Sequence, residues 1–317
     1  MRIVLSIDME GVSQLREPRE ILAACPEYWQ TGRARFEADT VAAAEGLLAA
    51  GADEVIVLDN HGSGNPENVP ADCLPAGARL EKWHVFDLPA QGIDAMFQLG
   101  YHSRGGGEGF VSHTYMPGLR LRAGDELISE SHGRAWAGRA PLIGIVGNDS
   151  HEQTLGSLAG TPYLVIQRTV RNDLAEPVFG EEEGLEAIRE FAARALRGLG
   201  EVPPPVPPAD FVFAASMPYG DDQVMEAAGW ERAGEVEFHA HLAEWADARL
   251  LLDVAMQAAI APLLPYFDGA TSPEAAAALD PARVERLGQI IDRWCGEPHP
   301  EWYTAPVDEL GLSIATR

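Results

Sequence analysis

The stretch that decides the fold is Arg2-Ile3-Val4-Leu5-Ser6-Ile7-Asp8-Met9-Glu10-Gly11, an apolar run that ends in two acidic residues and a glycine. Side chains alternate between the two faces of a strand, so Asp8 and Glu10 are expected on one face and Met9 on the other. Two carboxylates at the end of a buried strand repel each other unless a cation neutralises them or they share a proton. This stretch therefore predicts a buried strand that ends either in a metal site or in an acidic surface turn.

Two further apolar runs follow the first one along the chain. A helical pattern over residues 33–50 precedes the run at 53–60, and the run at 94–102 comes next. The order strand, helix, strand is typical of a βαβ unit, which implies a parallel sheet.

These runs end in histidines, His61 after the second run and His102 at the end of the third. In open parallel sheets the ligand site lies beyond the carboxyl ends of the strands. We therefore expect both histidines at the same sheet edge as Asp8 and Glu10, which favours a shared metal site over the acidic turn.

The rest of the chain extends this pattern into an α/β fold, a mostly parallel sheet flanked by helices with a second α+β half packed on it. A proline-rich connector at 200–210 separates a predicted metal-binding catalytic part, residues 1–200, from a C-terminal part, residues 209–317, packed as one unit with it. The other predicted elements are a loop over 12–32, a hairpin over 119–128, a helix around 132–139, strands over 141–149 and 163–167, a helix over 182–198, strands over 211–215 and 235–239, a long helix over 241–264, and short helices with a tail over 270–317.

Composition restricts the class of function. The formal net charge of -26 argues against binding to nucleic acid or to an anionic membrane, because phosphates would be repelled. No segment approaches the roughly 18 apolar residues of a membrane span, and the first strand is preceded by no signal-peptide pattern. The three cysteines show no paired spacing. A cytoplasmic enzyme with reduced thiols is the expectation.

The expected ligand set indicates which metals fit. Imidazole nitrogens and carboxylate oxygens without thiolate suit zinc, with manganese or iron as alternatives. Glu130 adds a fifth ligand to Asp8, Glu10, His61 and His102. Five ligands that include a carboxylate able to bridge fit two metal ions about 3.5–4 Å apart.

The opening motif resembles that of the zinc-dependent D-aminopeptidases encoded in bacterial dipeptide-transport operons. The resemblance covers roughly residues 1–265 and continues, in the same order, through the motifs at 60–63, 100–102, 112–114 and 147–149. It implies that Asp8 bridges two zinc ions, that Glu10, His61 and His102 are ligands, and that His113 is the catalytic histidine, described in that family as a nucleophile.

Three departures from the family pattern affect the expected site. Ser112 stands where the family has an aspartate before the catalytic histidine, so the orientation and basicity of that imidazole are open. The family's glutamate ligand is assigned to Glu130, with Glu126 as a competitor. Asn148 replaces one acid of a Gly-Asp-Asp motif, which predicts a changed substrate preference.

The predicted reaction is metal-assisted hydrolysis of an amide bond. Asp8 is expected to bridge the metals, with Glu10 and His102 completing one site and His61 and Glu130 the other. His113 is expected near the scissile bond, where a role as general base or acid is chemically easier to defend than covalent attack.

The resemblance implies short D-amino-acid peptides or amides as substrates. It also implies a large homo-oligomer, a decameric ring in the family, whose active sites face an inner chamber. Two alternatives remain: a dinuclear hydrolase of another small amide or of a phosphoester, in which Arg104 and the Gly105–Gly107 run would bind phosphate, and a non-catalytic metal-binding protein.

Overall fold

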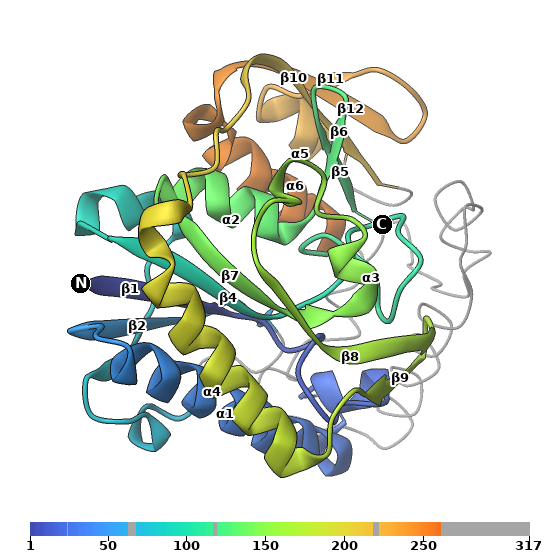
Figure 1. Cartoon of the computed structure of the whole chain (residues 1–317). Coiled ribbons are helices and arrows are strands. Elements are labelled where there is room, and N and C mark those ends of the chain that lie inside the picture. The colour runs from blue at the N-terminus through green and yellow to red at the C-terminus, as the bar shows by residue number, and fades with distance from the viewer. Residues whose placement is uncertain (24, 63–67, 117–118, 218–221, 261–317) are drawn as a thin grey trace.

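A large sheet at the centre of the molecule carries the first strand. The structure is a computed structural model that describes residues 1–260 apart from 24, 63–67, 117–118 and 218–221 (Figure 1). Within these residues the large sheet has the order β3-β2-β1-β4-β7-β8-β9, in which only the β8–β9 pair is antiparallel. Its strands are β1 (Arg2–Ile7), β2 (Glu54–Asp59), β3 (Ala78–Glu81), β4 (Ala95–Tyr101), β7 (Leu142–Asn148), β8 (Tyr163–Arg171) and β9 (Leu174–Pro177).

A second, antiparallel sheet has the order β11-β12-β10-β5-β6. Its strands are β5 (Arg120–Ala123), β6 (Glu126–Ile128), β10 (Ala209–Ser216), β11 (Glu231–Arg232) and β12 (Glu237–Glu244). The predicted hairpin, β5–β6, therefore pairs with β10 from the C-terminal part. The division of the chain into residues 1–200 and 209–317 stays a prediction.

Helices cover both faces of the large sheet (Figure 1). On one face Ile3, Leu5 and Ile7 of β1 belong to the same apolar core as α1 and α4, which pack against each other. On the other face Val4 shares a core with α2, α6 and the second sheet. The helices are α1 (Pro26–Ala49), α2 (Glu130–Gly138), α3 (Asp149–Glu152), α4 (Glu181–Arg197), α5 (Asp222–Ala227) and α6 (Ala248–Ile260), and the 3₁₀ helices are η1 (Pro18–Ile21), η3 (Ala71–Cys73), η4 (Val85–Gln91), η5 (Gly156–Leu158), η6 (Leu199–Glu201) and η7 (Trp245–Asp247).

The expected α/β class with a mostly parallel sheet is confirmed, but several predicted boundaries are wrong, two of them by several residues. Helix α1 begins at Pro26, inside the predicted loop 12–32, because proline favours the first helical position. Strand β12 runs to Glu244, where a helix from 241 was predicted, because burial of Phe238, Ala240 and Leu242 alternates with period two. The predicted elements over 270–317 lie outside the described residues.

The ends of β1 and β4 approach each other too closely for a side chain. Past β1, the backbone N–H of Asp8 donates to Leu99, and that of Gly11 donates to Gly100. Gly100 has a φ of 78°, and a Cβ added there would overlap the carbonyl oxygen of Asp8. A Cβ on Gly11 would likewise overlap the carbonyl oxygen of Tyr101. Glycine therefore fixes the relative position of the acidic loop and the end of β4.

Buried polar groups anchor the loop that follows β1. Gln167 Nε2 on β8 donates to the carbonyl oxygens of Glu10 and Val12, at 3.1 and 3.2 Å. The Asp39 carboxylate on α1 accepts from both the backbone N–H and the hydroxyl of Ser13, each at 2.6 Å. Burial raises the pKa of Asp39 to about 6. The backbone that carries Asp8 and Glu10 is thus held from both sides.

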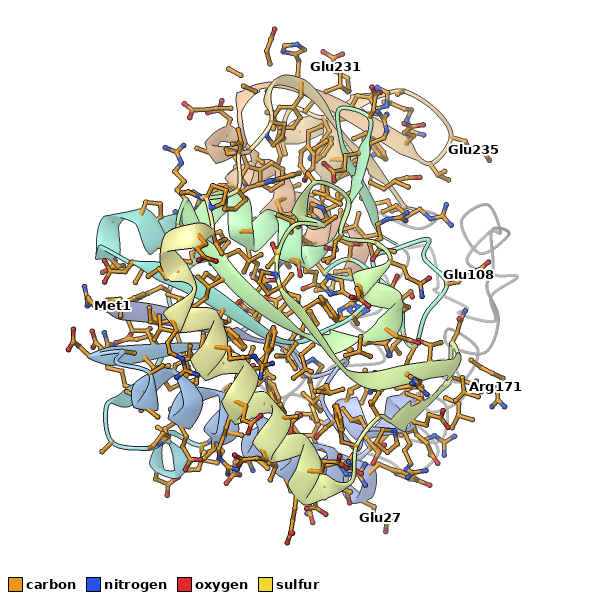
Figure 2. All side chains as sticks on the ribbon, in the orientation of Figure 1. Met1, Glu27, Glu108, Arg171, Glu231 and Glu235 are labelled. Atoms are coloured by element: carbon orange, nitrogen blue, oxygen red, sulfur yellow. The ribbon has the colours of Figure 1, made fainter. Side chains whose placement is uncertain are left out.

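Acidic side chains project from the surface of the molecule, as the excess negative charge requires. Figure 2 labels four of them that are exposed, Glu27, Glu108, Glu231 and Glu235. In the part of the chain that the structure describes, every helix is too short or too polar to span a bilayer.

Candidate metal centre

Three neighbouring strands of the large sheet deliver acidic and histidine side chains to one edge. Asp8 and Glu10 follow β1, His61 follows β2 and His102 follows β4, and β1 lies between β2 and β4. All four side chains are buried. The sequence-based expectation that these residues meet beyond the carboxyl ends of the strands matches their positions in the structure.

Two further predicted residues reach the same place from other elements. Glu130 is the first residue of α2, and His113 lies between β4 and β5. Helix α2 begins there because Ser129 forms a capping box with His132. Glu130 Oε1 accepts the backbone N–H of Tyr115 at 2.6 Å, so the ligand-bearing helix and the histidine-bearing loop are joined at the site.

Three groups of side chains could each hold a metal ion, and two of these groups share Asp8, while the third consists of Glu10, His102 and His113. In the first, His61 Nδ1 lies 3.7 Å from Asp8 Oδ1 and 3.3 Å from Glu10 Oε2. In the second, His102 Nε2 lies 3.5 Å from Asp8 Oδ2 and 3.6 Å from Glu130 Oε1. Each set of three could hold a metal ion. Because the two oxygens of Asp8 face different histidines, this carboxylate belongs to both groups.

The two groups that share Asp8 pair the residues differently from the sequence-based expectation, which combined Glu10 with His102 and His61 with Glu130; Glu10 and His102 lie together in the third group, with His113. The reason lies in strand order. His61 comes from β2 on one side of β1, whereas His102 comes from β4 on the other side. Helix α2 approaches from the β4 side and brings Glu130 to His102.

The distances within each group fit a zinc site better than direct hydrogen bonds. Hydrogen bonds to nitrogen are usually 2.7–3.2 Å long, and the four contacts above are longer. Two donor atoms that each bind one tetrahedral zinc ion at about 2.0–2.2 Å lie about 3.3–3.6 Å apart. Asp8 Oδ2 and His102 Nε2 are also buried without a hydrogen-bond partner. The residues present therefore fit zinc.

Charges in the centre act strongly on one another. Burial by itself would lower the pKa of His61, but Glu10 and Asp8 raise it well above 6.5. Burial would likewise lower the pKa of His102, but Asp8 and Glu130 raise it well above 6.5. Burial would raise the pKa of Asp8, yet His102 and His61 hold it well below its ordinary value. Without metal, the two imidazoles therefore carry the positive charge that the carboxylates require.

Each of the three histidines has one ring nitrogen on a backbone carbonyl. His61 Nε2 lies 2.7 Å from the carbonyl oxygen of Ile21, and His102 Nδ1 lies 3.0 Å from that of Ser103. His113 Nδ1 lies 2.7 Å from the carbonyl oxygen of Val111. A carbonyl only accepts, so this nitrogen bears the proton and the other one faces the centre.

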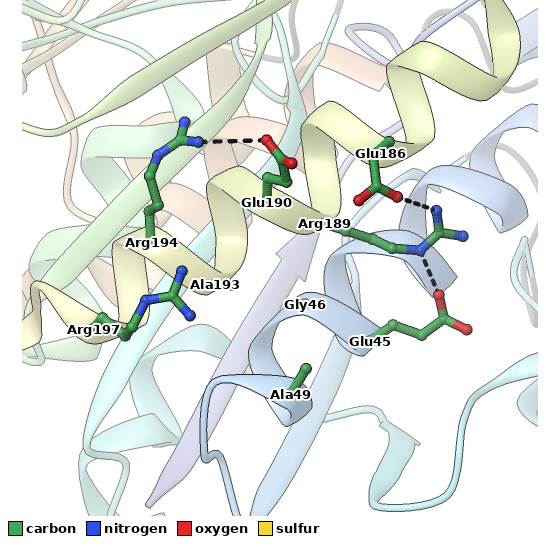
Figure 3. Close-up of a pocket in the computed structure, with 9 residues that line it drawn as sticks. All are labelled: Glu45, Gly46, Ala49, Glu186, Arg189, Glu190, Ala193, Arg194 and Arg197. Atoms are coloured by element: carbon green, nitrogen blue, oxygen red, sulfur yellow. Dashed lines mark hydrogen bonds and ion pairs between the residues drawn. The ribbon is translucent and has the colours of Figure 1, made fainter.

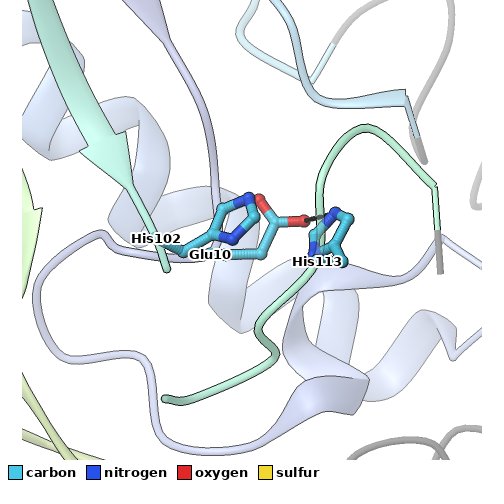
Figure 4. A group of neighbouring side chains, drawn as sticks. All are labelled: Glu10, His102 and His113. Atoms are coloured by element: carbon cyan, nitrogen blue, oxygen red, sulfur yellow. Dashed lines mark ion pairs between the residues drawn. The ribbon is translucent and has the colours of Figure 1, made fainter. Parts of the chain in front are cut away.

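His113 is a buried residue beside the candidate ligands rather than a surface residue. Figure 4 shows it with Glu10 and His102, and its ring stacks on that of His102 with centroids 4.2 Å apart. Its Nε2 lies 3.8 Å from both Glu10 Oε1 and Glu130 Oε1. Burial, followed by the charge on His102, lowers its pKa below 6.5. The Val111 carbonyl orients the ring, although Ser112 replaces the aspartate.

The backbone around His113 is strained. Val111 has a φ of 45° and Tyr115 a φ of 61°, in the left-handed region that side chains rarely adopt. For a β-branched residue such as valine this conformation is a true outlier. Strain of this kind persists only where the surroundings impose it, and it is concentrated at functional sites.

Comparison with known proteins identifies the family. The family model described as D-aminopeptidase matches residues 1–253. The chain belongs to the D-aminopeptidase family. As a member it is a hydrolase of the aminopeptidase class, which confirms the reaction class expected from the sequence. The matched range includes every candidate site residue named above.

Individual members agree with this assignment. The chain is 25% identical over 219 residues to the D-aminopeptidase of Bacillus subtilis strain 168, which covers 66% of this chain and 78% of that protein. Its fold matches that of the Zn-dependent D-aminopeptidase DppA from Bacillus subtilis, described as a self-compartmentalizing protease, with a TM-score of 0.72. That match has 20% identity and covers 82% of this chain and 98% of the other. It shows a shared fold.

Glu126, the competitor for the family's glutamate position, lies apart from the centre. Its Oε1 accepts the backbone N–H of Ser157 at 2.6 Å and contacts His132 Nε2 at 3.2 Å. The bond to His132 lowers the pKa of Glu126 to about 2. Because His132 caps α2 through Ser129, Glu126 supports the helix start that carries Glu130.

Two residues beside Glu130 were not singled out in the sequence. The Arg134 guanidinium lies 3.6 Å from Glu130 Oε2 and 5.3 Å from the ring centre of Tyr115. The available signal was the i, i+4 spacing of Glu130 and Arg134 on one helix. It could not be used because the helix was predicted to start after Glu130.

A separate cavity of about 530 Å³ lies between α1 and α4 (Figure 3). None of the candidate ligands lines it. Two of the arginines that line it are paired with acids: Arg189 with Glu45 and Glu186, and Arg194 with Glu190. Mixed, paired and exposed charges of this kind contribute little energy and are typical of a solvated helix surface.

Proposed function

We propose that the chain is a dinuclear zinc aminopeptidase that removes N-terminal D-amino acids from short peptides or amides. The observation that carries the proposal is the position of Asp8, whose two oxygens face His61 and His102 in two separate ligand groups. The named activity of the family and the zinc dependence of the structurally similar protein support it.

The proposed ligands are Asp8, Glu10 and His61 for one ion, and Asp8, His102 and Glu130 for the other. When bound, zinc at such a site polarises the scissile carbonyl and lowers the pKa of water towards neutrality.

His113 accepts and returns a proton in the proposed reaction. With Nδ1 protonated on the Val111 carbonyl, Nε2 is the atom that accepts a proton from the attacking water. The same atom then returns the proton to the leaving amine. The lowered pKa of His113 keeps Nε2 unprotonated near neutral pH, and burial removes water that would compete for this proton.

The direct test is hydrolysis of paired D- and L-aminoacyl amides by zinc-loaded protein. We expect cleavage of D-alaninamide and D-alanyl-D-alanine, a clear preference over the L forms, and loss of activity after chelation that zinc restores. Metal content measured on the same samples should be two zinc ions per subunit. If the zinc-loaded protein cleaves none of these compounds, the proposed activity is wrong.

Zinc binding should release protons. In the metal-free protein the pKa values of His61 and His102 are raised above 6.5, so both rings hold a second proton at pH 6.5. They lose this proton only when the pH rises through the raised pKa values. Zinc requires neutral imidazole, so its affinity should increase as pH rises through these pKa values. Calorimetric zinc titrations at pH 7 in two buffers of different ionisation enthalpy would show about two protons released. Equal heats in both buffers would contradict this charge arrangement.

The assembly and location are part of the proposal. The structurally similar protein is described as self-compartmentalizing, which supports a homo-oligomer here. A decameric ring, a cytoplasmic location and the absence of nucleic-acid and membrane partners stay predictions. Light scattering of the full chain would give the subunit number.

A further inference from the structure

Arg134 is a nearly buried cation whose position the ligand groups do not explain. Its side chain is 12% exposed and lies on α2, one helical turn after Glu130. Its Nε is buried without a hydrogen-bond partner. The contact to Glu130 Oε2 is 3.6 Å long, beyond hydrogen-bond distance, and the ring of Tyr115 covers the guanidinium. The guanidinium therefore has at least one buried donor, Nε, that no acceptor satisfies, beside its long ion pair with Glu130.

Charge balance does not account for Arg134 once metal is bound. Asp8, Glu10 and Glu130 supply three negative charges, and two zinc ions more than balance them. The guanidinium then adds positive charge to a centre that is already positive, and Glu130, its ion-pair partner, is shared with the metal site, so the buried charge is only partly compensated. A zinc-loaded site with a net positive charge favours a ligand that carries a negative group close to the reacting bond.

We propose that Arg134 binds the C-terminal carboxylate of a dipeptide substrate, an inference that rests on the proposed function. The guanidinium lies 3.6 Å from one oxygen of Glu130, whose other oxygen faces His102. In a dipeptide the carboxylate carbon lies about 3–4 Å from the scissile carbonyl carbon. The fixed guanidinium, 3.6 Å from a ligand side chain, therefore lies at a distance that suits the carboxylate of a bound dipeptide.

The geometry also gives a length preference. Each added residue moves the carboxylate up to about 3.3–3.6 Å further from the scissile bond. Arg134 is held by α2 and by the ring of Tyr115, so its guanidinium cannot follow. The tyrosine hydroxyl is itself buried without a hydrogen-bond partner and lies close to Gly133 of α2. Dipeptides should be cleaved better than tripeptides.

The experiment compares three substrates: D-alanyl-D-alanine, its C-terminal amide, and the D-alanine tripeptide. The variants are Arg134→Gln and Arg134→Lys, with Arg139→Gln as the control. Arg139 follows the same helix, is exposed and pairs with Glu244. In Arg134→Gln, kcat/KM for the free dipeptide should fall about 10- to 100-fold, whereas kcat/KM for the amide should change less than about threefold. For the free dipeptide, kcat/KM of Arg134→Lys should lie between those of the unmodified protein and Arg134→Gln, because lysine keeps the charge but lacks the planar guanidinium that binds a carboxylate with two hydrogen bonds.

Zinc content of each variant separates this role from support of Glu130. Unchanged zinc with loss confined to the free carboxylate supports the proposal. An equal loss on dipeptide and amide, or a loss of zinc, would overturn it and leave Arg134 as a residue that positions Glu130. If the unmodified protein cleaves the amide and the free dipeptide equally well, the carboxylate role is wrong while the aminopeptidase function stands. If it cleaves neither, the proposed function itself is wrong.

Discussion

A His113→Ala variant should keep its zinc and lose activity by at least about 100-fold on the best D-aminoacyl substrate. The imidazole lies beside both ligand groups, with Nε2 3.8 Å from Glu10 and from Glu130, and alanine offers no proton acceptor there. The loss should be in kcat, because a proton is transferred only in the reaction itself. Steady-state kinetics combined with metal analysis would measure both quantities.

The matched control is His239→Ala, a partly exposed histidine on β12 that pairs with Glu237. It should leave kcat unchanged. In the unmodified protein, activity should fall as acid protonates His113, and this limb should lie below pH 6.5 because the pKa of His113 is lowered. An unchanged rate in His113→Ala would remove His113 from the mechanism, and loss of zinc would instead make it a ligand.

An Asp8→Asn variant should lose zinc binding, and its activity should fall by about 10³-fold or more. Metal ions contribute several kcal/mol of charge stabilisation to such reactions, and each 1.4 kcal/mol corresponds to a tenfold change in rate. Asparagine preserves shape but offers one neutral oxygen in place of two charged ones. Because Asp8 belongs to both groups, the two ions should be lost together.

Zinc titration of metal-free Asp8→Asn would check this expectation. Asp125→Asn, an exposed change in the β5–β6 turn, is the control and should bind two ions normally. If Asp8→Asn bound one ion tightly, the two groups would be independent and Asp8 would not be a bridge.

The sequence predicted the large sheet well because parallel strands that are buried on both faces are continuous apolar runs. β1, β2 and β4 are of this kind, and their ends predicted where the acids and histidines meet. β3 and β9 were missed because they lie at the two edges of the sheet and contain charged residues, so neither is a continuous apolar run.

The finer geometry of the site could not be predicted, for a physical reason. The oxygens that orient His61, His102 and His113 are backbone carbonyls, and every residue type carries one. The pairing of Glu10 with His61 depends on which strand lies on which side of β1, and that is a property of the whole sheet.

The contact between Gly100 and Asp8 has a consequence for how this enzyme can vary. Any side chain at Gly100 or Gly11 would push the β1 end away from β4, and with it Asp8 away from His102. The spacing of the two strand ends therefore cannot be adjusted in small steps. Variation in substrate choice within such a scaffold must come from the histidine-bearing loop and from α2, which approach the fixed edge from outside. Directed evolution of specificity should concentrate on those two segments and leave the strand ends unchanged.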